Sequence, residues 1–357
     1  MPADLVEDVW RERDTSPARI EAALRGILSE RHAESEGFVA ARTLNLVAIV
    51  DAEFRGEIEN RLQKVGRYLP SRTILCAVRK GQQTIDAWCS MAAEEPASSN
   101  GDRAIARERI ELIIGPEHLK SLATIVDPLV VTDLATVVWA PHGHADGVDA
   151  LRRLAQVVLI DSLDESEVSL ALCRADELAG DLYIVDLAWL RSTPWRERVA
   201  AAFDPPAFRP SLKEISGVTV RHRPDSGASA MLFVGWLASR LGWRPERLTS
   251  RGDEWRGTVR ARRGEVRLRL EPADDMKAPG LGGVTVETAS GSSVSLDRSP
   301  GGLKEVRRER DGNEQSWTVL GASRGEPGIL GEGVRQALLR DPTYKPALAA
   351  ARVMVGR

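Results

Sequence analysis

The sequence has few cysteines and no long apolar run, and both absences exclude classes of protein. Among its 357 residues are only three cysteines, Cys76, Cys89 and Cys173. Three are too few for a disulfide framework, and they lack the C-x-x-C spacing typical of zinc and redox sites. No stretch of about 18 apolar residues occurs, and the first residues mix acids and bases without the apolar centre of a signal peptide. We therefore expect a cytoplasmic protein with reduced thiols, neither inserted in a membrane nor secreted.

The composition is otherwise that of a globular protein with an uneven charge distribution. Hydrophobic residues make up 43% of the chain and charged residues 28%, which is enough apolar material for packed cores. Residues 1–190 carry 20 Lys and Arg against 32 Asp and Glu, whereas residues 191–357 carry 29 against 20. Such halves attract each other or present two distinct surfaces to a partner. Bulk binding of nucleic acid is not indicated.

The length and the hydrophobic pattern predict two domains, at roughly 100 to 200 residues each. We expect an N-terminal helical segment over residues 1–40, then an α/β domain with a mostly parallel sheet over 41–204, because apolar strands alternate with helical patterns there. Asp204-Pro205-Pro206 is the expected boundary. The region 205–357 has short strands separated by glycine turns, which predicts an α+β domain with an antiparallel sheet.

Two of the cysteines fall on strands that we expect to form a hairpin. Strand 73–78 is followed by a Gly81-Gln82 turn and strand 84–91, and this register places Cys76 opposite Ala87. Cys89 is then a diagonal neighbour, about 7–8 Å away, at or beyond the reach of an unstrained disulfide. Buried, unpaired thiols are the favoured interpretation.

Two short motifs suggest chemistry but fit ordinary structure better. Residues 321–325, Gly-Ala-Ser-Arg-Gly, match the G-x-S-x-G nucleophile elbow. Pro327 and Gly328 stand where the required helix would begin, so a glycine-rich turn is favoured. His142, His144 and Asp146 follow a strand at the expected ligand-binding edge of a parallel sheet. No further His or Cys cluster offers the remaining ligands of a metal site, so we predict a solvated loop and neither metal nor cofactor.

A third segment is the candidate anion-binding site. Arg221, His222, Arg223 and Ser226 lie between a strand and the start of the helix predicted over 227–241. Free N–H groups at a helix start together with guanidinium groups suit a phosphate. The alternative is that Asp225 or Ser226 only caps the helix while the arginines face water.

Residues 258–271 predict a basic hairpin that could contact a partner. We expect a turn at Arg263-Gly264 that pairs Arg262 with Glu265 and places Arg260 opposite Arg267. Like charges opposite each other destabilise a sheet, so the arginines need solvent or an acidic partner. The candidate partner interface consists of the following residues: Arg260, Arg262, Arg267, Arg269, Trp243 and Trp255.

Several stretches taken together resemble the glucose-6-phosphate dehydrogenase assembly protein (OpcA) family. They are Arg42 to Val47, Pro128 to Pro141, Asp186 to Arg196 (Asp-Leu-Ala-Trp-Leu-Arg-Ser-Thr-Pro-Trp-Arg) and Gly235 to Arg240 (Gly-Trp-Leu-Ala-Ser-Arg). The resemblance implies an N-terminal α/β domain, a C-terminal domain and a non-catalytic role. That role is to bind glucose-6-phosphate dehydrogenase and promote its active oligomer in the oxidative pentose phosphate pathway.

Two hypotheses follow. The first is this assembly factor, without catalytic residues or cofactor. The second is a sugar-phosphate-binding enzyme with Arg221, His222 and Arg223 as an anion clamp and His142 or His144 as acid or base. A hybrid, in which a sugar phosphate acts as an effector of the assembly factor, is a further alternative.

Overall fold

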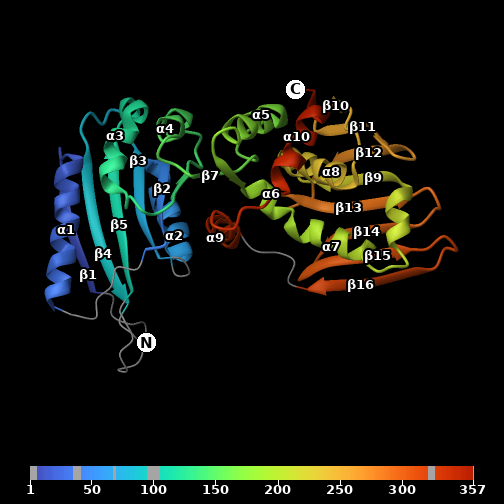
Figure 1. Cartoon of the computed structure of the whole chain (residues 1–357), viewed down its shortest axis with the longest axis horizontal. Helices are drawn as coiled ribbons and strands as arrows, with labels where there is room; N and C mark the ends of the chain where they lie inside the picture. The colour runs from blue at the N-terminus through green and yellow to red at the C-terminus, as the bar shows by residue number, and fades with distance from the viewer. Residues whose placement is uncertain (1–5, 35–41, 67–69, 95–104, 321–325, 357) are drawn as a thin grey trace. The chain divides into compact units, whose positions relative to one another are not determined.

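The chain forms two compact units, shown in the computed structural model of Figure 1. The structure describes residues 6–34, 42–66, 70–94, 105–320 and 326–356. Unit 1 comprises Met1–Ile160 and Asp181–Ile184, and unit 2 comprises Asp161–Gly180 and Val185–Arg357. The chain thus enters unit 2 well before the boundary expected at Asp204. The helices between residues 161 and 204 pack on the second sheet and its helices, and this packing assigns them to unit 2.

Unit 1 is built on a mostly parallel sheet with the strand order β1-β4-β5-β3-β2-β6-β7-β8. Its strands are β1 (Val6–Glu12), β2 (Leu44–Asp51), β3 (Ser71–Val78), β4 (Asp86–Glu94), β5 (Ile105–Ile114), β6 (Thr136–Trp139), β7 (Val157–Ile160) and β8 (Tyr183–Asp186). Strand β2 is buried from Leu44 to Val50, as expected for a strand between two helical layers. The parallel sheet is confirmed.

The helices of unit 1 differ in part from the prediction. They are α1 (Pro17–Glu34), η1 (Ala52–Phe54), α2 (Arg55–Gly66), η2 (Pro116–Ser121), α3 (Leu122–Val126), η3 (Asp127–Leu129) and α4 (Ala145–Ala150). Helix α1 lies where it was expected, but β1 precedes it, so the N-terminal segment is not only helical. The helix expected from Glu117 to Val131 is instead the three short consecutive pieces η2, α3 and η3, and Pro128 lies at the start of the last of them.

The predicted hairpin of the two cysteine strands is wrong. Strand β5 lies between β3 and β4: Cys76 on β3 is paired with Leu112, and Cys89 on β4 is paired with Ile110. Strand β5 pairs parallel with β3 and antiparallel with β4, which places it in the interior of the sheet. Both thiols are buried and free, and burial raises the pKa of each to about 12. The prediction of buried, unpaired thiols is confirmed.

Unit 2 is built on a mostly antiparallel sheet with the order β10-β11-β12-β9-β13-β14-β15-β16. Its strands are β9 (Ile215–His222), β10 (Thr249–Arg251), β11 (Glu254–Ala261), β12 (Gly264–Pro272), β13 (Leu281–Thr288), β14 (Ser293–Ser299), β15 (Gly302–Arg308) and β16 (Glu314–Leu320). Neighbouring strands of this sheet pair antiparallel except for β12 with β9, which pair parallel. The expected antiparallel sheet is confirmed.

The helices of unit 2 include two that meet closely at small residues. They are α5 (Val168–Leu178), α6 (Leu187–Arg191), α7 (Thr193–Phe203), η4 (Arg209–Glu214), η5 (Pro224–Ser226), α8 (Gly227–Leu241), α9 (Glu326–Gln336) and α10 (Tyr344–Val355). A Cβ on Gly235 of α8 would collide with the carbonyl oxygen of Ala347 on α10. The glycine therefore permits the close approach of the two helices. Among the helices described, none is long and apolar enough to cross a membrane.

Candidate functional site

The strand order of unit 1 locates one candidate site. Strands β5-β3-β2-β6-β7-β8 follow the order 3-2-1-4-5-6 of dinucleotide-binding folds, with β1 and β4 added at the β5 edge. In such sheets, ligands bind beyond the carboxyl ends of the two strands at which the order reverses. Here these strands are β2 and β6, so Asp51 and the loop after Trp139 lie at this edge of the sheet.

Two histidines and an aspartate occupy this edge of the sheet. The N–H of Asp51 donates to Nδ1 of His142 at 3.0 Å, and Nε2 of His144 lies 3.1 Å from Oδ1 of Asp51. The ring of Phe54 lies 4.8 Å from that of His142. Burial lowers the pKa of both histidines, although Asp51 opposes this. The segment is thus anchored to β2, and the predicted solvated loop is wrong in this respect.

The residues at this edge do not fit a dinucleotide. The fold binds a pyrophosphate through free N–H groups of a glycine-rich turn after the first strand. In this chain the turn reads Asp51-Ala-Glu-Phe-Arg-Gly56 and has a single glycine. Its first N–H is already bonded to His142, and the Asp51 carboxylate would repel a phosphate. The described residues also contain no group of three or more His, Cys, Asp or Glu placed to hold a metal ion.

The candidate anion-binding residues of unit 2 do not form a clamp. Arg221 is paired with Asp297 at 2.5 Å, and Arg223 is paired with Asp225. His222 is fully buried, and its Nδ1 lies 2.8 Å from the carbonyl oxygen of Arg223. Ser226 is also buried, and its hydroxyl accepts from the N–H of Gly280 at 2.9 Å. The guanidinium groups are held by carboxylates, so we find no support for a phosphate here.

A buried carboxylate, that of Asp186, connects several segments of unit 2. Asp186 accepts hydrogen bonds from the Ser162 N–H at 3.1 Å and hydroxyl at 2.6 Å, from the Ala188 N–H at 2.9 Å, and from the Tyr344 hydroxyl at 3.1 Å. Burial, with a smaller contribution from Asp161, raises the pKa of Asp186 to about 6. The bonds hold the carboxylate in place but do not fully offset its desolvation.

This pKa gives a testable pH dependence. The folded protein holds the Asp186 proton more tightly than the unfolded chain, so this carboxyl stabilises the protein below about pH 4, and that stability is lost as the pH rises through about 6. The loss corresponds to about 3 kcal/mol. Because Asp186→Asn cannot ionise, its unfolding free energy relative to wild type should increase over this window in urea titrations. A decrease would show that the pKa is lowered in the folded state.

The tryptophan-rich stretch after β8 has a structural role. The Trp189 indole N–H donates to Asp341 at 2.8 Å, and the guanidinium carbon of Arg196 lies 3.4 Å from the centre of the Trp189 ring. Arg196 is only 8% exposed and also contacts the Ser192 hydroxyl. The cation–π contact links α6 to α7, and the hydrogen bond to Asp341 links α6 to the segment before α10. The residues Asp186 to Arg196 thus position helices and do not line an open site.

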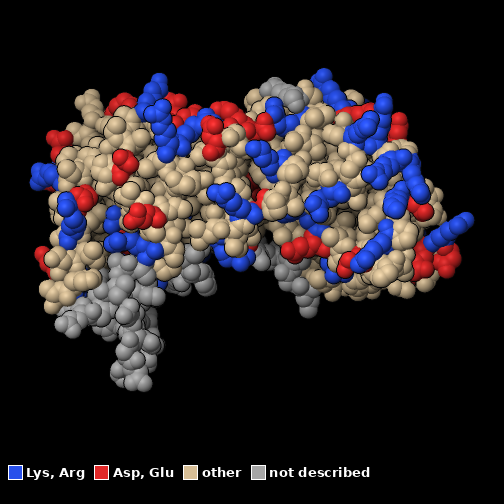
Figure 2. All heavy atoms as spheres, in the orientation of Figure 1, with Lys and Arg blue, Asp and Glu red and all other residues tan. Residues whose placement is uncertain are grey.

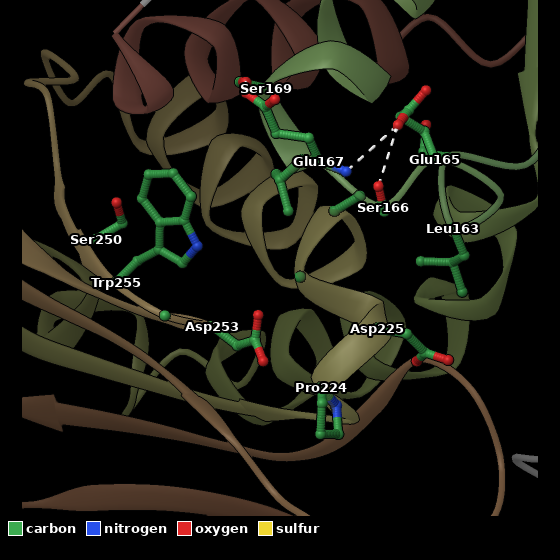
Figure 3. Close-up of a pocket in the computed structure, with 15 residues that line it drawn as sticks. Leu163, Glu165, Ser166, Glu167, Ser169, Pro224, Asp225, Ser250, Asp253 and Trp255 are labelled. Atoms are coloured by element: carbon green, nitrogen blue, oxygen red, sulfur yellow. Dashed lines mark hydrogen bonds between the residues drawn. The ribbon is translucent and has the colours of Figure 1, made fainter.

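Unit 2 also contains a groove, which we name the Trp255 groove after its aromatic residue. It consists of two adjoining hollows of about 430 and 530 Å³ that share Glu167, Ser169, Ser250 and Trp255. Figure 3 shows Trp255 on one side of the first hollow, with Glu165 and Asp225 opposite and Asp253 along the lower edge. The carboxylates come from the start of α5, the start of α8 and the turn between β10 and β11.

The sequence analysis found Trp255 but missed the carboxylates around it. Glu165, Glu167 and Asp253 come from segments some 85 residues apart, and nothing in their local sequence distinguishes them from exposed acidic residues elsewhere. Only the tertiary packing of α5 beside the β10–β11 turn brings them to one groove.

The basic hairpin exists, but its register differs from the prediction. Ala261 pairs with Gly264, so Arg260 faces Glu265 and not Arg267. Arg262 and Arg263 form the turn. Gly264 follows them with a φ of +113°, a backbone conformation that residues with a side chain rarely adopt. Arg267 faces Thr258, and the opposed like charges are Arg256 and Arg269.

The side chains of this hairpin nevertheless divide between two faces. Val259, Val266, Leu268 and Leu270 are buried on the helix-covered face of the sheet, whereas the arginines are exposed. Arg260 pairs with Glu246 at 2.6 Å, Arg267 with Glu287 at 3.8 Å, and Arg269 with Glu271 at 3.4 Å. Such exposed pairs contribute little stability. Lys and Arg side chains are prominent on unit 2 in Figure 2.

Two other features singled out in the sequence are Trp243 and the G-x-S-x-G motif. Trp243 is 7% exposed and belongs to the core, so it cannot serve as an exposed interface anchor. The G-x-S-x-G motif at 321–325 lies outside the described residues.

Comparison with known proteins identifies related sequences over most of the chain. Residues 62–176 and 182–348 match family models described as the N-terminal and C-terminal domains of a glucose-6-phosphate dehydrogenase subunit. OxPP cycle protein OpcA of Synechococcus elongatus is 27% identical over 217 residues, and that of Nostoc punctiforme is 30% identical over 165 residues. The matches cover 58% and 45% of this chain but only 47% and 34% of the relatives.

A solved structure, an oxidoreductase domain protein from Kribbella flavida, is similar over 87% of this chain and 95% of its own. The TM-score is 0.45 and the identity 12%. At these values the likeness says nothing about activity.

Proposed function

Because the chain belongs to the glucose-6-phosphate dehydrogenase assembly protein (OpcA) family, we propose that it binds glucose-6-phosphate dehydrogenase and promotes the active oligomer of that enzyme without turnover of its own. The observation that carries the proposal is the match to both domains of the dehydrogenase subunit, which together extend from residue 62 to residue 348. The proposal includes the expected cytoplasmic location.

Two features of unit 1 and unit 2 support a non-catalytic role. The turn after β2 lacks the glycines and free N–H groups that a dinucleotide needs, since its first N–H is bonded to His142. The arginines of the candidate anion clamp are paired with carboxylates. The clamp arginines are therefore already engaged within the chain, and the turn after β2 does not suit a dinucleotide cofactor.

The basic hairpin is the proposed docking surface for the dehydrogenase. Its exposed arginines are Arg260, Arg267 and Arg269 on β11 and β12 and Arg262 in the turn between the two strands. The ion pairs that Arg260, Arg267 and Arg269 form within the chain are exposed and contribute little stability. An acidic surface of a partner can therefore replace these carboxylates with little loss of free energy. Charges of this kind speed and orient docking more than they add affinity.

An activity assay tests the proposal. The cognate dehydrogenase should turn over glucose 6-phosphate faster, or with a lower KM, in the presence of the chain. The chain alone should show no turnover with glucose 6-phosphate and a nicotinamide cofactor. Unchanged kinetics of the dehydrogenase over a range of chain concentrations would contradict the proposal, and turnover by the chain alone would contradict its non-catalytic part.

A further inference from the structure

One edge of the unit 1 sheet is open to pairing with a further strand. Strand β1 lies at this edge and pairs with β4 on one side only, in a register without a bulge. An edge strand of this kind presents backbone N–H and C=O groups that can bond another strand. The sequence of β1 contains neither the proline nor the lysine that often protects such an edge. Its central residue, Val9, is 47% exposed.

A groove of about 440 Å³ follows this edge between β1 and α1, which runs beside the strand in Figure 1. On the strand it is lined by Val9 and Trp10. The helix residues that line it are Arg19, Ala22, Ala23, Gly26, Ile27 and Glu30. The groove side of α1 therefore has a cation near the start of the helix, an anion near its end and mostly small residues between them.

The charges along β1 suit pairing with a second copy of the same strand. When two copies run antiparallel about a two-fold axis at Val9, Glu7 of one strand is opposite Arg11 of the other, and this pairing occurs twice. No like charges are opposite each other in this register. Opposite charges across a pair of strands stabilise it, and like charges destabilise it. The sequence of β1 is thus complementary to itself.

The groove side of α1 is complementary to itself as well. A two-fold axis perpendicular to the sheet places a second α1 antiparallel to the first. Arg19 of one copy then lies beside Glu30 of the other, at both ends of the helix pair. Between these ends, Ala22 and Gly26 leave room for a second helix at the usual separation of about 8–10 Å. No described atom lies within 4 Å of the position that a Cβ on Gly26 would occupy.

The same axis serves the strand and the helix. Arg19 forms an ion pair with Glu12, which fixes the height of the helix beside the strand. Val9 lies about 10 Å from Glu12 along the strand. The same distance along α1 leads from Arg19 to Gly26, which is about 2 Å from the midpoint between Arg19 and Glu30. The two complementary patterns therefore agree on the position of the axis.

We propose that β1 and α1 form the interface of a symmetric dimer of this chain, in which the two sheets join through antiparallel β1 strands and the two α1 helices pack across the axis. The occupant of the groove is a second copy because the charges of both elements match those of their own copies. The interface belongs to unit 1 and the basic hairpin to unit 2, so the dimer and the function proposed above are tested separately.

The mass of the chain in solution tests the dimer. Sedimentation equilibrium should give twice the monomer mass of 39.0 kDa as the concentration rises. Gly26→Leu should weaken the dimer at least about tenfold, because leucine fills the space that the second helix needs. Gly56→Leu is the matched control and should leave dimerisation unchanged. Gly56 is also an exposed helix glycine of unit 1 with no described atom within 4 Å of its Cβ position.

An exchange of charges tests the contact between the copies. Glu30→Arg alone should weaken the dimer, because it places two positive charges together at each end of the helix pair. Adding Arg19→Glu should restore the dimer with the charges reversed. Arg19 is 67% exposed, so the loss of its pair with Glu12 costs little stability. Circular dichroism reports whether each variant is folded, and the charge exchange decides the matter if Gly26→Leu unfolds.

Three results would overturn the proposal. The first is a mass of 39.0 kDa at every concentration up to about 100 μM. The second is equal dimerisation of the Gly26→Leu and Gly56→Leu variants, which would place the contact elsewhere. The third is a chain that stays monomeric while Gly26→Leu weakens its complex with the dehydrogenase, which would assign the groove to that enzyme and not to a second copy.

Discussion

Gly235→Ala is expected to destabilise unit 2 by about 3 kcal/mol, the upper end of the range for overpacked positions. The added Cβ would collide with the backbone carbonyl oxygen of Ala347 and lie 3.1 Å from the amide nitrogen of Ala351. A backbone atom cannot rotate away as a side chain can, so α8 and α10 have to separate. Urea unfolding followed by tryptophan fluorescence measures the change, and Gly235→Val should have a larger effect.

Gly331→Ala is the matched control. Gly331 also lies in a helix of unit 2, α9, but nothing is within 4 Å of the position that its Cβ would occupy. Alanine favours a helix over glycine by roughly 1 kcal/mol, so this variant should be as stable as wild type or slightly more stable. If Gly235→Ala were equally well tolerated, the close crossing of α8 and α10 would be wrong.

Arg260→Glu combined with Arg267→Glu should slow association with the dehydrogenase about tenfold at low salt. Both side chains are largely exposed, at 68% and 75%, and are paired only with surface carboxylates. Reversing their charge therefore removes attraction to an acidic partner without disturbing the core. We expect association kinetics, measured by surface plasmon resonance, to lose much of their salt dependence, while the melting temperature of the isolated chain hardly changes.

The control for this variant lies on the same face of the sheet. Lys304 and Arg308 are exposed on β15, beside the edge strand β16 at the opposite end of the sheet, so Lys304→Glu with Arg308→Glu changes the net charge equally. A similar slowing by both double variants would mean that total charge, and not the hairpin, governs association. A large loss of stability in the hairpin variant would instead show that its arginines serve the chain itself.

Much of the fold follows from patterns within the sequence. Helix α8 begins and ends at the predicted residues, because an apolar stretch follows Ser226 and Gly242 adopts the left-handed conformation at its end. The alternation of apolar and charged residues in β11 and β12 agrees with the burial of Val259, Val266, Leu268 and Leu270. Both signals are local, and local periodicity is what a single sequence expresses best.

The errors concern strand pairing and the placement of helices. Nothing local shows that β5 inserts between β3 and β4, or that Gly264 moves the hairpin turn onto Arg262 and Arg263. The sequence likewise does not show that α5 to α7 pack on the second sheet, which shifts the expected boundary. The sequence also does not show that Arg221 of the candidate anion-binding segment pairs with Asp297, which lies 76 residues away along the chain.

The most direct test of the central claim is the mass of the cognate dehydrogenase in solution, measured by light scattering with and without an equimolar amount of this chain. We predict a particle that contains both proteins, together with a shift of the dehydrogenase toward its larger, active oligomer. If the dehydrogenase keeps the same mass and the chain of 39.0 kDa elutes separately at activating concentrations, the proposed assembly function is contradicted.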